Sequence, residues 1–118
     1  MNSDCTIYKT ADFIGKKWTI LIILELYKGE KEKRYSEIKK RLPGITPKIL
    51  SLRLKELEKH KLIKKTTDKS KFPIKCEYSL TESGREFIPI VKSMKQWALK
   101  YKFKNKLCSE TDCEHCEL

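Results

Sequence analysis

A helical repeat of leucines occupies the centre of the chain, over residues 47–60. At 100° per residue, Leu50, Leu54 and Leu57 fall within about 60° of arc, which predicts one buried helix face. A Pro-Gly pair predicts a turn just before, and Thr46 followed by Pro47 is typical of a helix start. The helix is expected to end near His60. Its outer face is basic and nearly free of acids, with Lys48, Ser51, Leu52, Lys55 and Lys59.

Three segments before this helix are also predicted to be helical. Residues 18–27 (WTILIILELY) are apolar almost all round, which fits a buried helix or a buried strand. Their length and the Lys28-Gly29 stop favour a helix through the core. Residues 36–42 predict a short helix capped by Ser36, so that helix, turn and helix form a helix-turn-helix. Residues 4–14 predict a first helix capped by Ser3 or Asp4.

Alternating residues follow the leucine-rich helix and predict a hairpin. Residues 62–67 and 74–80 are the expected strands, with Pro73 in the connection. In the second strand, Ile74, Cys76, Tyr78 and Leu80 are expected on one face and Lys75, Glu77 and Ser79 on the other. A hairpin with a basic tip after such a helix is a wing. Its predicted phosphate contacts are Lys64, Lys65, Lys69, Lys71 and Lys75.

A long helix capped by Thr81 is predicted over residues 82–103. Its apolar positions recur at i, i+4, i+7 and i+11, giving the stripe Ile90, Met94, Trp97 and Tyr101. This is more apolar surface than the outermost helix of a small domain needs, and it predicts a dimer interface. The expected fold is α+β: a winged helix-turn-helix with added N- and C-terminal dimerisation helices. Residues 1–106 form the expected DNA-binding and dimerisation domain, and residues 107–118 an acidic, cysteine-rich tail.

Charge favours a polyanionic partner. The 118 residues carry a net charge of +11, and residues 33–75 hold 15 Lys or Arg against 4 acids. Nucleic acid is the first expectation and an anionic membrane the second. Double-stranded DNA would be contacted by Arg53 as well as by the outer face of the leucine-rich helix and the wing. A lysine-rich bias of composition and an ordinary solvent-exposed helix remain the alternatives.

The five cysteines fall into three settings. Cys5 is expected in the first turn of a helix, where the helix N-terminus and nearby cations favour the reactive thiolate; packing at a dimer seam is the alternative. Cys76 is expected in the core. Cys108, Cys113, Cys116 and His115 offer three thiols and an imidazole within nine residues, which suits Zn²⁺ or an iron–sulfur cluster. A tail disulfide and a reduced tail are the other possibilities.

Four features together resemble the HxlR-type transcriptional regulators, a winged-helix group related to the MarR family. They are GKKWTILIILEL, RYSEIKKRLPGITPKILSLRLKELEKHKLI, FPIKCEYSLTESG and the spacing to Trp97, and the resemblance covers residues 5–101. It implies a homodimer joined by the first and last helices, with two recognition helices in successive major grooves. It also implies a cysteine thirteen residues before a tryptophan, as Cys5 is before Trp18, which senses oxidants or electrophiles in several members. By the same resemblance both termini lie at the interface, so Cys5 could be a fourth metal ligand.

Three positions depart from that family pattern. Thr6 stands where a proline usually follows the cysteine. His60-Lys61 replaces an Asp-Gly pair, so a non-glycine residue is expected in the left-handed conformation. The tail CSETDCEHC is not part of the pattern.

Enzymatic chemistry is not expected from this sequence. It has no glycine-rich phosphate loop, no paired carboxylates in an apolar setting and no histidine placed as a general base. No signal peptide and no run of about 18 apolar residues is visible, so a cytoplasmic protein without a membrane partner is expected. The alternative function is a winged-helix module that binds protein in a transcription complex and has no operator of its own.

Overall fold

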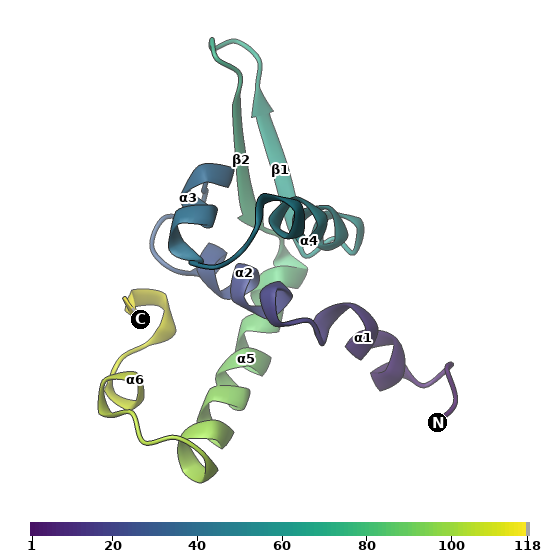
Figure 1. Cartoon of the computed structure of the whole chain (residues 1–118), viewed down its shortest axis with the longest axis vertical. Coiled ribbons are helices and arrows are strands. Elements are labelled where there is room, and N and C mark those ends of the chain that lie inside the picture. Colours follow the sequence, from purple (N-terminus) through teal and green to yellow (C-terminus); the bar gives the residue numbers. More distant parts are fainter. Residues whose placement is uncertain (118) are drawn as a thin grey trace.

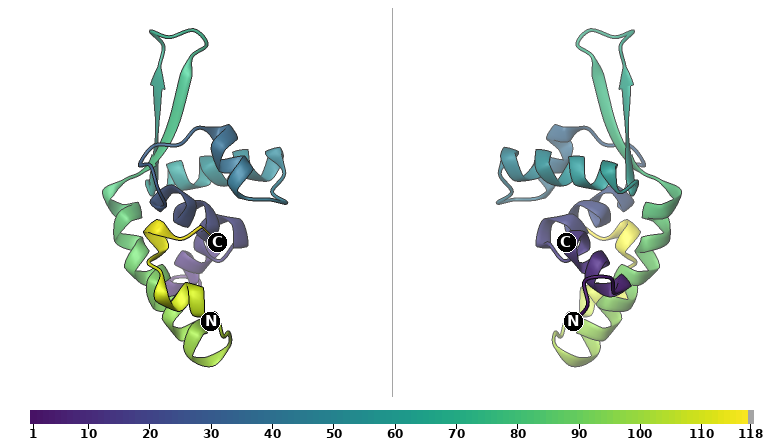
Figure 2. Two further views of the ribbon diagram at one scale, coloured as in Figure 1. Left: turned by 90° about the vertical axis from the view of Figure 1, so that its left-hand side faces the viewer. Right: turned by 90° about the vertical axis from the view of Figure 1, so that its right-hand side faces the viewer.

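Helices dominate the computed structural model, which describes residues 1–117. In chain order the elements are α1 (Thr6–Ile14), α2 (Lys17–Tyr27), α3 (Tyr35–Arg41), α4 (Pro47–Lys59), β1 (Ile63–Asp68), β2 (Lys75–Leu80), α5 (Glu82–Tyr101), α6 (Lys106–Glu110) and the 3-10 helix η1 (Cys113–His115). The β1–β2 hairpin rises from one end of the molecule and α5 extends toward the other (Figures 1 and 2). This is the predicted winged helix-turn-helix with additional terminal helices.

The core lies between α2, α3, α4 and the base of the hairpin. Leu50, Leu54 and Leu57 are all buried there, as their spacing predicted. The Thr46 hydroxyl accepts a hydrogen bond from the Ile49 amide at 3.2 Å, which confirms the predicted N-cap of α4. The segment 18–27 is a helix, also as predicted, and packs against α4 and α5.

Lys61 confirms the unusual end of α4. It has a φ of 62°, so a lysine takes the left-handed conformation where glycine is favoured. Its carbonyl accepts a hydrogen bond from the Thr81 hydroxyl at 2.6 Å. Thr81, the N-cap residue of α5, therefore stabilises the turn that leads into β1, and this hydrogen bond offsets part of the backbone strain at Lys61.

Two helix starts differ from the prediction. α1 begins at Thr6 with Cys5 as N-cap and no side-chain cap, so neither Ser3 nor Asp4 caps it. α3 begins one residue before Ser36, with Arg34 as N-cap, and the Glu37 carboxylate accepts a hydrogen bond from the Arg34 amide at 3.1 Å. Both predictions were wrong because several polar residues precede each helix, and sequence alone does not select among them.

The two strands form an antiparallel wing in which Ile63 pairs with Leu80 and Asp68 with Lys75. Tyr78 and Leu80 are buried as predicted, but Ile74 is exposed, Cys76 is half-buried and Ser79 is buried. The wing extends beyond the core, so no element within residues 1–117 covers the apolar face of its outer half. At its base the wing is packed closely, which buries Ser79. The prediction that Cys76 lies in the core was therefore wrong.

The start of α5 approaches β1 very closely. A Cβ atom on Gly84 would lie 2.1 Å from the Leu62 carbonyl oxygen, so only glycine fits this position. The Thr81 hydroxyl accepts a hydrogen bond from the Gly84 amide at 3.2 Å and confirms the predicted cap. The spacing Thr-x-x-Gly thus both starts α5 and docks it on the wing.

The C-terminal segment folds back along α5 to reach α2 (Figures 1 and 2). The Gly29 amide donates to the Glu114 carbonyl at 3.2 Å, and the Lys95 ammonium donates to the Thr111 carbonyl at 2.9 Å. Lys92 pairs with Asp112 at 3.4 Å and donates to the Tyr27 hydroxyl at 3.2 Å. The Tyr27 contact, with that of Asp112, raises the pKa of Lys92. Polar contacts thus hold the segment to two helices.

Candidate nucleic-acid interface and thiol sites

The outer face of α4 presents the short polar, apolar and basic groups that base edges and phosphates require. All five residues predicted for this face are exposed: Lys48, Ser51, Leu52, Lys55 and Lys59. They stand on a helix whose opposite face is locked into the core, so the exposed face has a fixed direction. Gly44, with a φ of 95°, makes the turn from α3 into this helix.

Arg53 is placed differently. Its side chain is mostly buried, and its Nη1 donates to Glu56 at 3.2 Å, while Lys16 pairs with the same carboxylate at 3.3 Å. Arg53 is therefore held along α4 by Glu56 and does not present its guanidinium outward, while the Lys16–Glu56 pair ties α4 to the start of α2. The helical spacing predicted that Arg53 contacts DNA, and it did not show that Glu56 is near enough to pair with the guanidinium.

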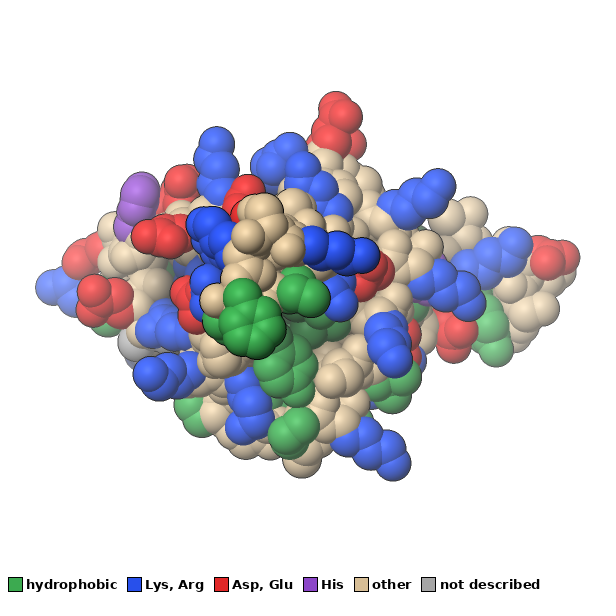
Figure 3. Space-filling model, turned by 90° about the horizontal axis from the view of Figure 1, so that it is seen from above, with side chains coloured by type: hydrophobic (Ala, Val, Ile, Leu, Met, Phe, Trp, Pro, Cys, Tyr) green, Lys and Arg blue, Asp and Glu red, His purple; other side chains and the backbone are tan. Residues whose placement is uncertain are grey.

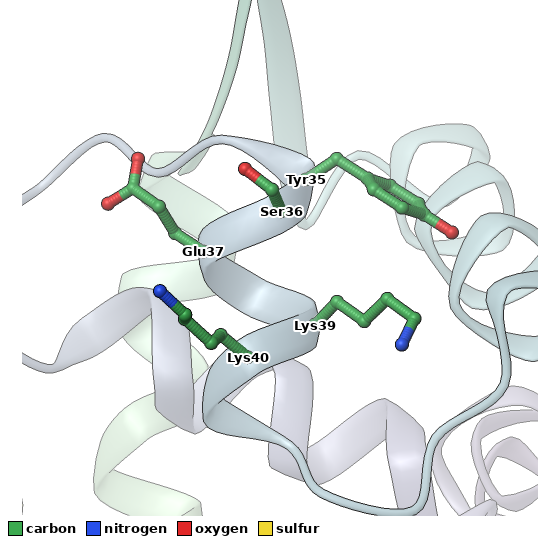
Figure 4. Close-up of a pocket in the computed structure, with 5 residues that line it drawn as sticks. All are labelled: Tyr35, Ser36, Glu37, Lys39 and Lys40. Carbon is green, nitrogen blue, oxygen red and sulfur yellow. The ribbon is translucent and has the colours of Figure 1, made fainter.

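Tyr35 joins the two helices of the helix-turn-helix. Its hydroxyl donates to the Pro47 carbonyl at 3.1 Å and accepts from the Ser51 hydroxyl at 3.5 Å. Figure 4 shows Tyr35 and Lys39 on the side of α3 that faces α4, with Glu37 and Lys40 on the other side. The five residues drawn line a shallow hollow of about 340 Å³. The sequence reasoning did not assign these α3 side chains, although burial of Ile38 leaves Lys39 and Lys40 facing outward.

The wing adds a second basic surface. Lys64, Lys65, Lys69 and Lys71 are exposed along it, as expected for phosphate contacts. Lys75 is half-buried and pairs with Glu77 at 2.8 Å, and this hydrogen bond is the main cause that lowers the pKa of Glu77. Four of the five predicted wing lysines are thus directed to solvent, and the fifth has an acidic neighbour.

A buried ion cluster fixes α3 and the wing relative to α2. Glu25 is only 4 % exposed and accepts from Arg41 at 3.0 Å, with the Lys33 ammonium 4.0 Å away. Lys33 also donates to the carbonyls of Glu25 and Lys28, and its backbone pairs with Tyr78 of β2. Burial lowers the pKa of Lys33, and Glu25 opposes that shift. α3 and the wing therefore share one anchor on α2.

At the opposite end, α5 presents an apolar face that no described residue covers. The stripe Ile90, Met94, Trp97 and Tyr101 is 58, 49, 55 and 62 % exposed, respectively. Ile7 and Tyr8 of α1 are exposed as well. We call these six residues the apolar face. The arrangement brings the predicted interface residues together on one helix, with α1 as a second source of uncovered apolar surface.

Cys5 is half-buried at the N-cap of α1. The C-terminal end of α1 contacts the C-terminal end of α4. Phe13 stacks there on His60, with ring centroids 4.0 Å apart and planes 11° apart. Figure 1 shows α1 and the C-terminal segment on opposite sides of α2 and α5. The arrangement therefore does not bring Cys5 to the tail cysteines of the same chain.

The three tail cysteines share an apolar cavity. Cys108, Cys113 and Cys116 line a space of about 270 Å³ between the C-terminal segment and two helices, with Leu24 of α2 and Met94 of α5 among its walls. Cys113 is buried, and within residues 1–117 none of the five cysteines forms a disulfide. His115 does not line this cavity; it lines a neighbouring hollow with Glu25, Arg41 and Cys116. In the same residues no group of three or more His, Cys, Asp or Glu side chains is placed to hold a metal. The Zn²⁺ or iron–sulfur site therefore stays a prediction, because the described side chains are not arranged around one metal position.

Comparison with known proteins identifies the architecture. The family model described as HxlR-like helix-turn-helix matches residues 13–106, from the end of α1 to the start of α6. The chain belongs to the HxlR family. Its members are transcriptional regulators and not enzymes, and the helix-turn-helix implies DNA binding. No helix within residues 1–117 is both long and apolar enough to cross a bilayer.

Similar transcriptional regulators agree with this assignment. The HTH-type transcriptional regulator YdeP of Bacillus subtilis is 42 % identical over 98 residues, which are 83 % of this chain and 74 % of YdeP. The reduced form of the transcriptional regulator YodB from B. subtilis superimposes with a TM-score of 0.74 and 33 % identity, covering 86 % of this chain and 98 % of YodB. The redox regulator HypR in its oxidised form superimposes with a TM-score of 0.69 and 37 % identity, covering 84 % of this chain and 99 % of HypR. The predicted family was therefore correct.

Proposed function

We propose that this protein is a homodimeric, sequence-specific DNA-binding transcriptional regulator whose operator affinity depends on the state of its cysteine thiols. The observation that carries the proposal is the separation of two surfaces. A basic helix and wing lie at one end, and an uncovered apolar face with the cysteine-bearing segments lies at the other.

The DNA-reading part of the proposal rests on α4 and the wing. Lys48, Ser51, Leu52 and Lys55 approach base edges in the major groove, with Leu52 suited to a thymine methyl group. The exposed wing lysines and Lys39 of α3 neutralise phosphates. Arg53 and Lys75 contribute only if they exchange their present carboxylate partners for DNA.

The dimer follows from the apolar face. Two copies that join these surfaces around a two-fold axis bury the stripe on α5 against its equivalent, an isologous contact. The α4 helices of the two copies then face the same side of a duplex and can contact half-sites about 34 Å apart, one turn of the duplex. A small rotation at the seam changes that spacing and therefore the fit to the operator.

In this proposal the thiols cause such a rotation. Cys5 begins α1, and the Phe13–His60 stack connects the other end of α1 to the end of the recognition helix. The tail cysteines lie behind α5, whose Met94 belongs both to their cavity and to the apolar face. An oxidant that removes two electrons and two protons from a thiol pair forms one S–S bond, which favours whichever dimer geometry accommodates it. Two similar structures support a redox stimulus, since one is the reduced form of YodB and the other is the redox regulator HypR in its oxidised form.

The test is operator binding under three treatments. Wild type, Cys5→Ser and a variant with all three tail cysteines changed to serine are compared when reduced, diamide-oxidised and chelated. Cys76→Ser is the matched control, because Cys76 lies in the wing, away from the dimer face. We expect oxidation to change the affinity of wild type and of Cys76→Ser, and to have less effect on a variant that lacks a participating thiol.

Two outcomes separate the parts of the proposal. If no treatment alters the affinity of wild type, the cysteines are structural and the regulatory part fails while DNA binding stands. If wild type does not bind any duplex in a salt-dependent manner, the protein-interaction module is the better description. Loss of binding on chelation alone would assign a metal to the tail.

A further inference from the structure

The tip of the wing carries an apolar cluster that has no packing partner among residues 1–117. Phe72 is fully exposed and Ile74 is exposed, and Pro73 lies between them. Figure 3, which looks at the molecule from the wing end, shows hydrophobic side chains grouped there with Lys and Arg side chains around them. A phenyl ring is among the groups that gain most from leaving water, so its position at the farthest point of a charged protein calls for a partner.

The wing holds this cluster away from the core. Its base is anchored, because Ile63, Tyr78 and Leu80 are buried. The ladder then continues without interruption to the Asp68–Lys75 pair, while the outer residues Lys64 to Thr67 of β1 are exposed. No described element packs over Phe72 at the tip. The tip is therefore presented outward by a paired, directed support.

The charges beside the cluster indicate the nature of its partner. Lys69 and Lys71 are exposed on either side of Ser70. The one acid nearby, Asp68, accepts hydrogen bonds from the Ser70 amide at 3.0 Å and the Ser70 hydroxyl at 2.5 Å, and these bonds lower its pKa. An aromatic ring flanked by cations suits a surface where phosphates border stacked aromatic groups. That description fits a DNA groove better than an acidic protein surface.

The length of the wing matches the distance between neighbouring grooves. Each strand has six residues, so the wing reaches about 20 Å at 3.3 Å per residue. The minor groove next to a major groove occupied by α4 lies about half a helical repeat away, roughly 17 Å. The wing rises beside α4 and beyond it (Figures 1 and 2). Its tip can therefore reach the minor groove while α4 occupies the major groove.

We propose that Phe72 is a wedge that enters the minor groove and partly unstacks one base step, with Ile74 against the groove wall and Lys69 and Lys71 on the flanking phosphates. This rests on the proposed DNA binding and adds a specificity determinant to it. Apolar wedges of this kind bend the duplex toward the major groove by about 20–90°, and pyrimidine–purine steps deform most easily. The operator is then expected to have such a step where the wing tip lands, outside the bases that α4 reads.

The experiment uses the full chain and duplexes that wild type selects from a random 30-base-pair pool. Each selected duplex carries 2-aminopurine, whose fluorescence rises on unstacking, at successive positions in the flank. Phe72→Ala is compared with Phe72→Leu, which keeps an apolar wedge, and with Lys69→Ala, which removes a phosphate contact. Because Phe72 is exposed, its replacement leaves the core intact, and circular dichroism checks that the fold is retained.

The expected results differ in kind between these variants. Wild type and Phe72→Leu raise the fluorescence at one flank position and bend the duplex, whereas Phe72→Ala does neither. Phe72→Ala loses roughly tenfold in affinity for the selected duplex without changing the dependence on salt, because it removes no ionic contact. Lys69→Ala weakens binding to all sequences and reduces the salt slope by about one unit.

The wedge is overturned if wild type gives no fluorescence change at any flank position, or if Phe72→Ala binds and bends the duplex as wild type does. It is also overturned if Phe72→Ala reduces the salt slope, because the ring would then only be positioning the lysines. In each of these cases wild type still binds DNA. If wild type binds none of the duplexes, the proposed function fails along with the wedge.

Discussion

The two ends of this molecule use their hydrophobic residues in opposite ways. At the end formed by α3, α4 and the wing, the apolar residues meet inside the chain, and mainly charged and polar groups reach the surface. At the end formed by α1 and α5, large apolar side chains remain about half exposed. Apart from the exposed wing tip, one chain completes the first end, whereas the second requires another surface to cover it.

The difference separates two physical tasks. A DNA reader needs rigid placement of polar groups, which a closed core and the Glu25 ion cluster supply. A dimer interface that responds to a stimulus needs contacts that can rearrange, and such contacts are not locked inside one core. The Phe13–His60 stack is one of the contacts that join the two ends, beside the Lys16–Glu56 pair.

The largest effect is expected from a charge in the middle of the apolar face. Trp97→Asp would bury an unpaired carboxylate at the proposed seam and weaken dimerisation by about 4 kcal/mol, roughly a thousandfold. Sedimentation of wild type and variant across a range of concentrations measures this.

The matched control is Gln96→Asp, which adds the same charge to the same helix away from the stripe and should remain dimeric. If Trp97→Asp is as dimeric as this control, the apolar face is not the interface and the contrast between the two ends loses its basis.

A smaller effect is expected from opening the closed end. Glu25→Ala leaves Arg41 without its acceptor and leaves the buried Lys33 without its counter-charge. The substitution should therefore lower the free energy of unfolding by about 3 kcal/mol. Urea unfolding measures it, with Glu30→Ala, an exposed acid, as the control that should change little.

Glu25→Gln sharpens this test because it keeps an acceptor for Arg41 but removes the charge. An intermediate loss is expected. A Glu25→Ala protein as stable as wild type would show that the cluster contributes little to holding α3 and the wing on α2.

The smallest effect concerns the C-terminal segment and depends on pH. Asp112 accepts a hydrogen bond from the Glu114 amide at 3.0 Å and pairs with Lys92, and these contacts keep its pKa below the ordinary 3.8. A depressed carboxyl pKa stabilises the folded form above the unfolded value, and that stabilisation is lost as pH falls through the folded value. The segment should therefore loosen as pH falls below about 3.8.

Amide hydrogen exchange of residues 111–116, expressed as protection factors, follows this loosening. Asp112→Asn should remove the acid dependence and leave the global stability almost unchanged, because the ion pair is exposed to solvent. Equal pH dependence in wild type and Asp112→Asn would assign the loosening to another group.

Local patterns predicted the reading end well. The leucine spacing, the Thr46 cap and the alternation before Leu80 identified α4 and the wing, because each depends on neighbours within a few residues. The left-handed residue at Lys61 followed from the missing glycine. Exposure of the basic side chains on α4 also followed, since the other face of that helix was assigned to the core.

Long-range partners decided what those patterns left open. Glu56 pairs with Arg53 on its own helix and also with the distant Lys16, and the buried Glu25 is matched by Lys33 and Arg41 from a later loop and helix. Cys76 and Ile74 alternate correctly but lie where the wing has left the core. None of these outcomes can be obtained from periodicity, because each depends on which residues from distant positions come together.

By itself, the sequence determined the order of elements, the winged-helix family and the basic and apolar faces, all properties of local spacing and composition. Tertiary structure alone decided that the three tail cysteines line one apolar cavity, that Cys5 lies on the other side of α2 and α5 from them, and that Phe13 stacks on His60. The physical reason is that burial and contact are cooperative properties of the whole chain. A residue type and a spacing specify which face a side chain occupies, and only packing specifies what it meets there.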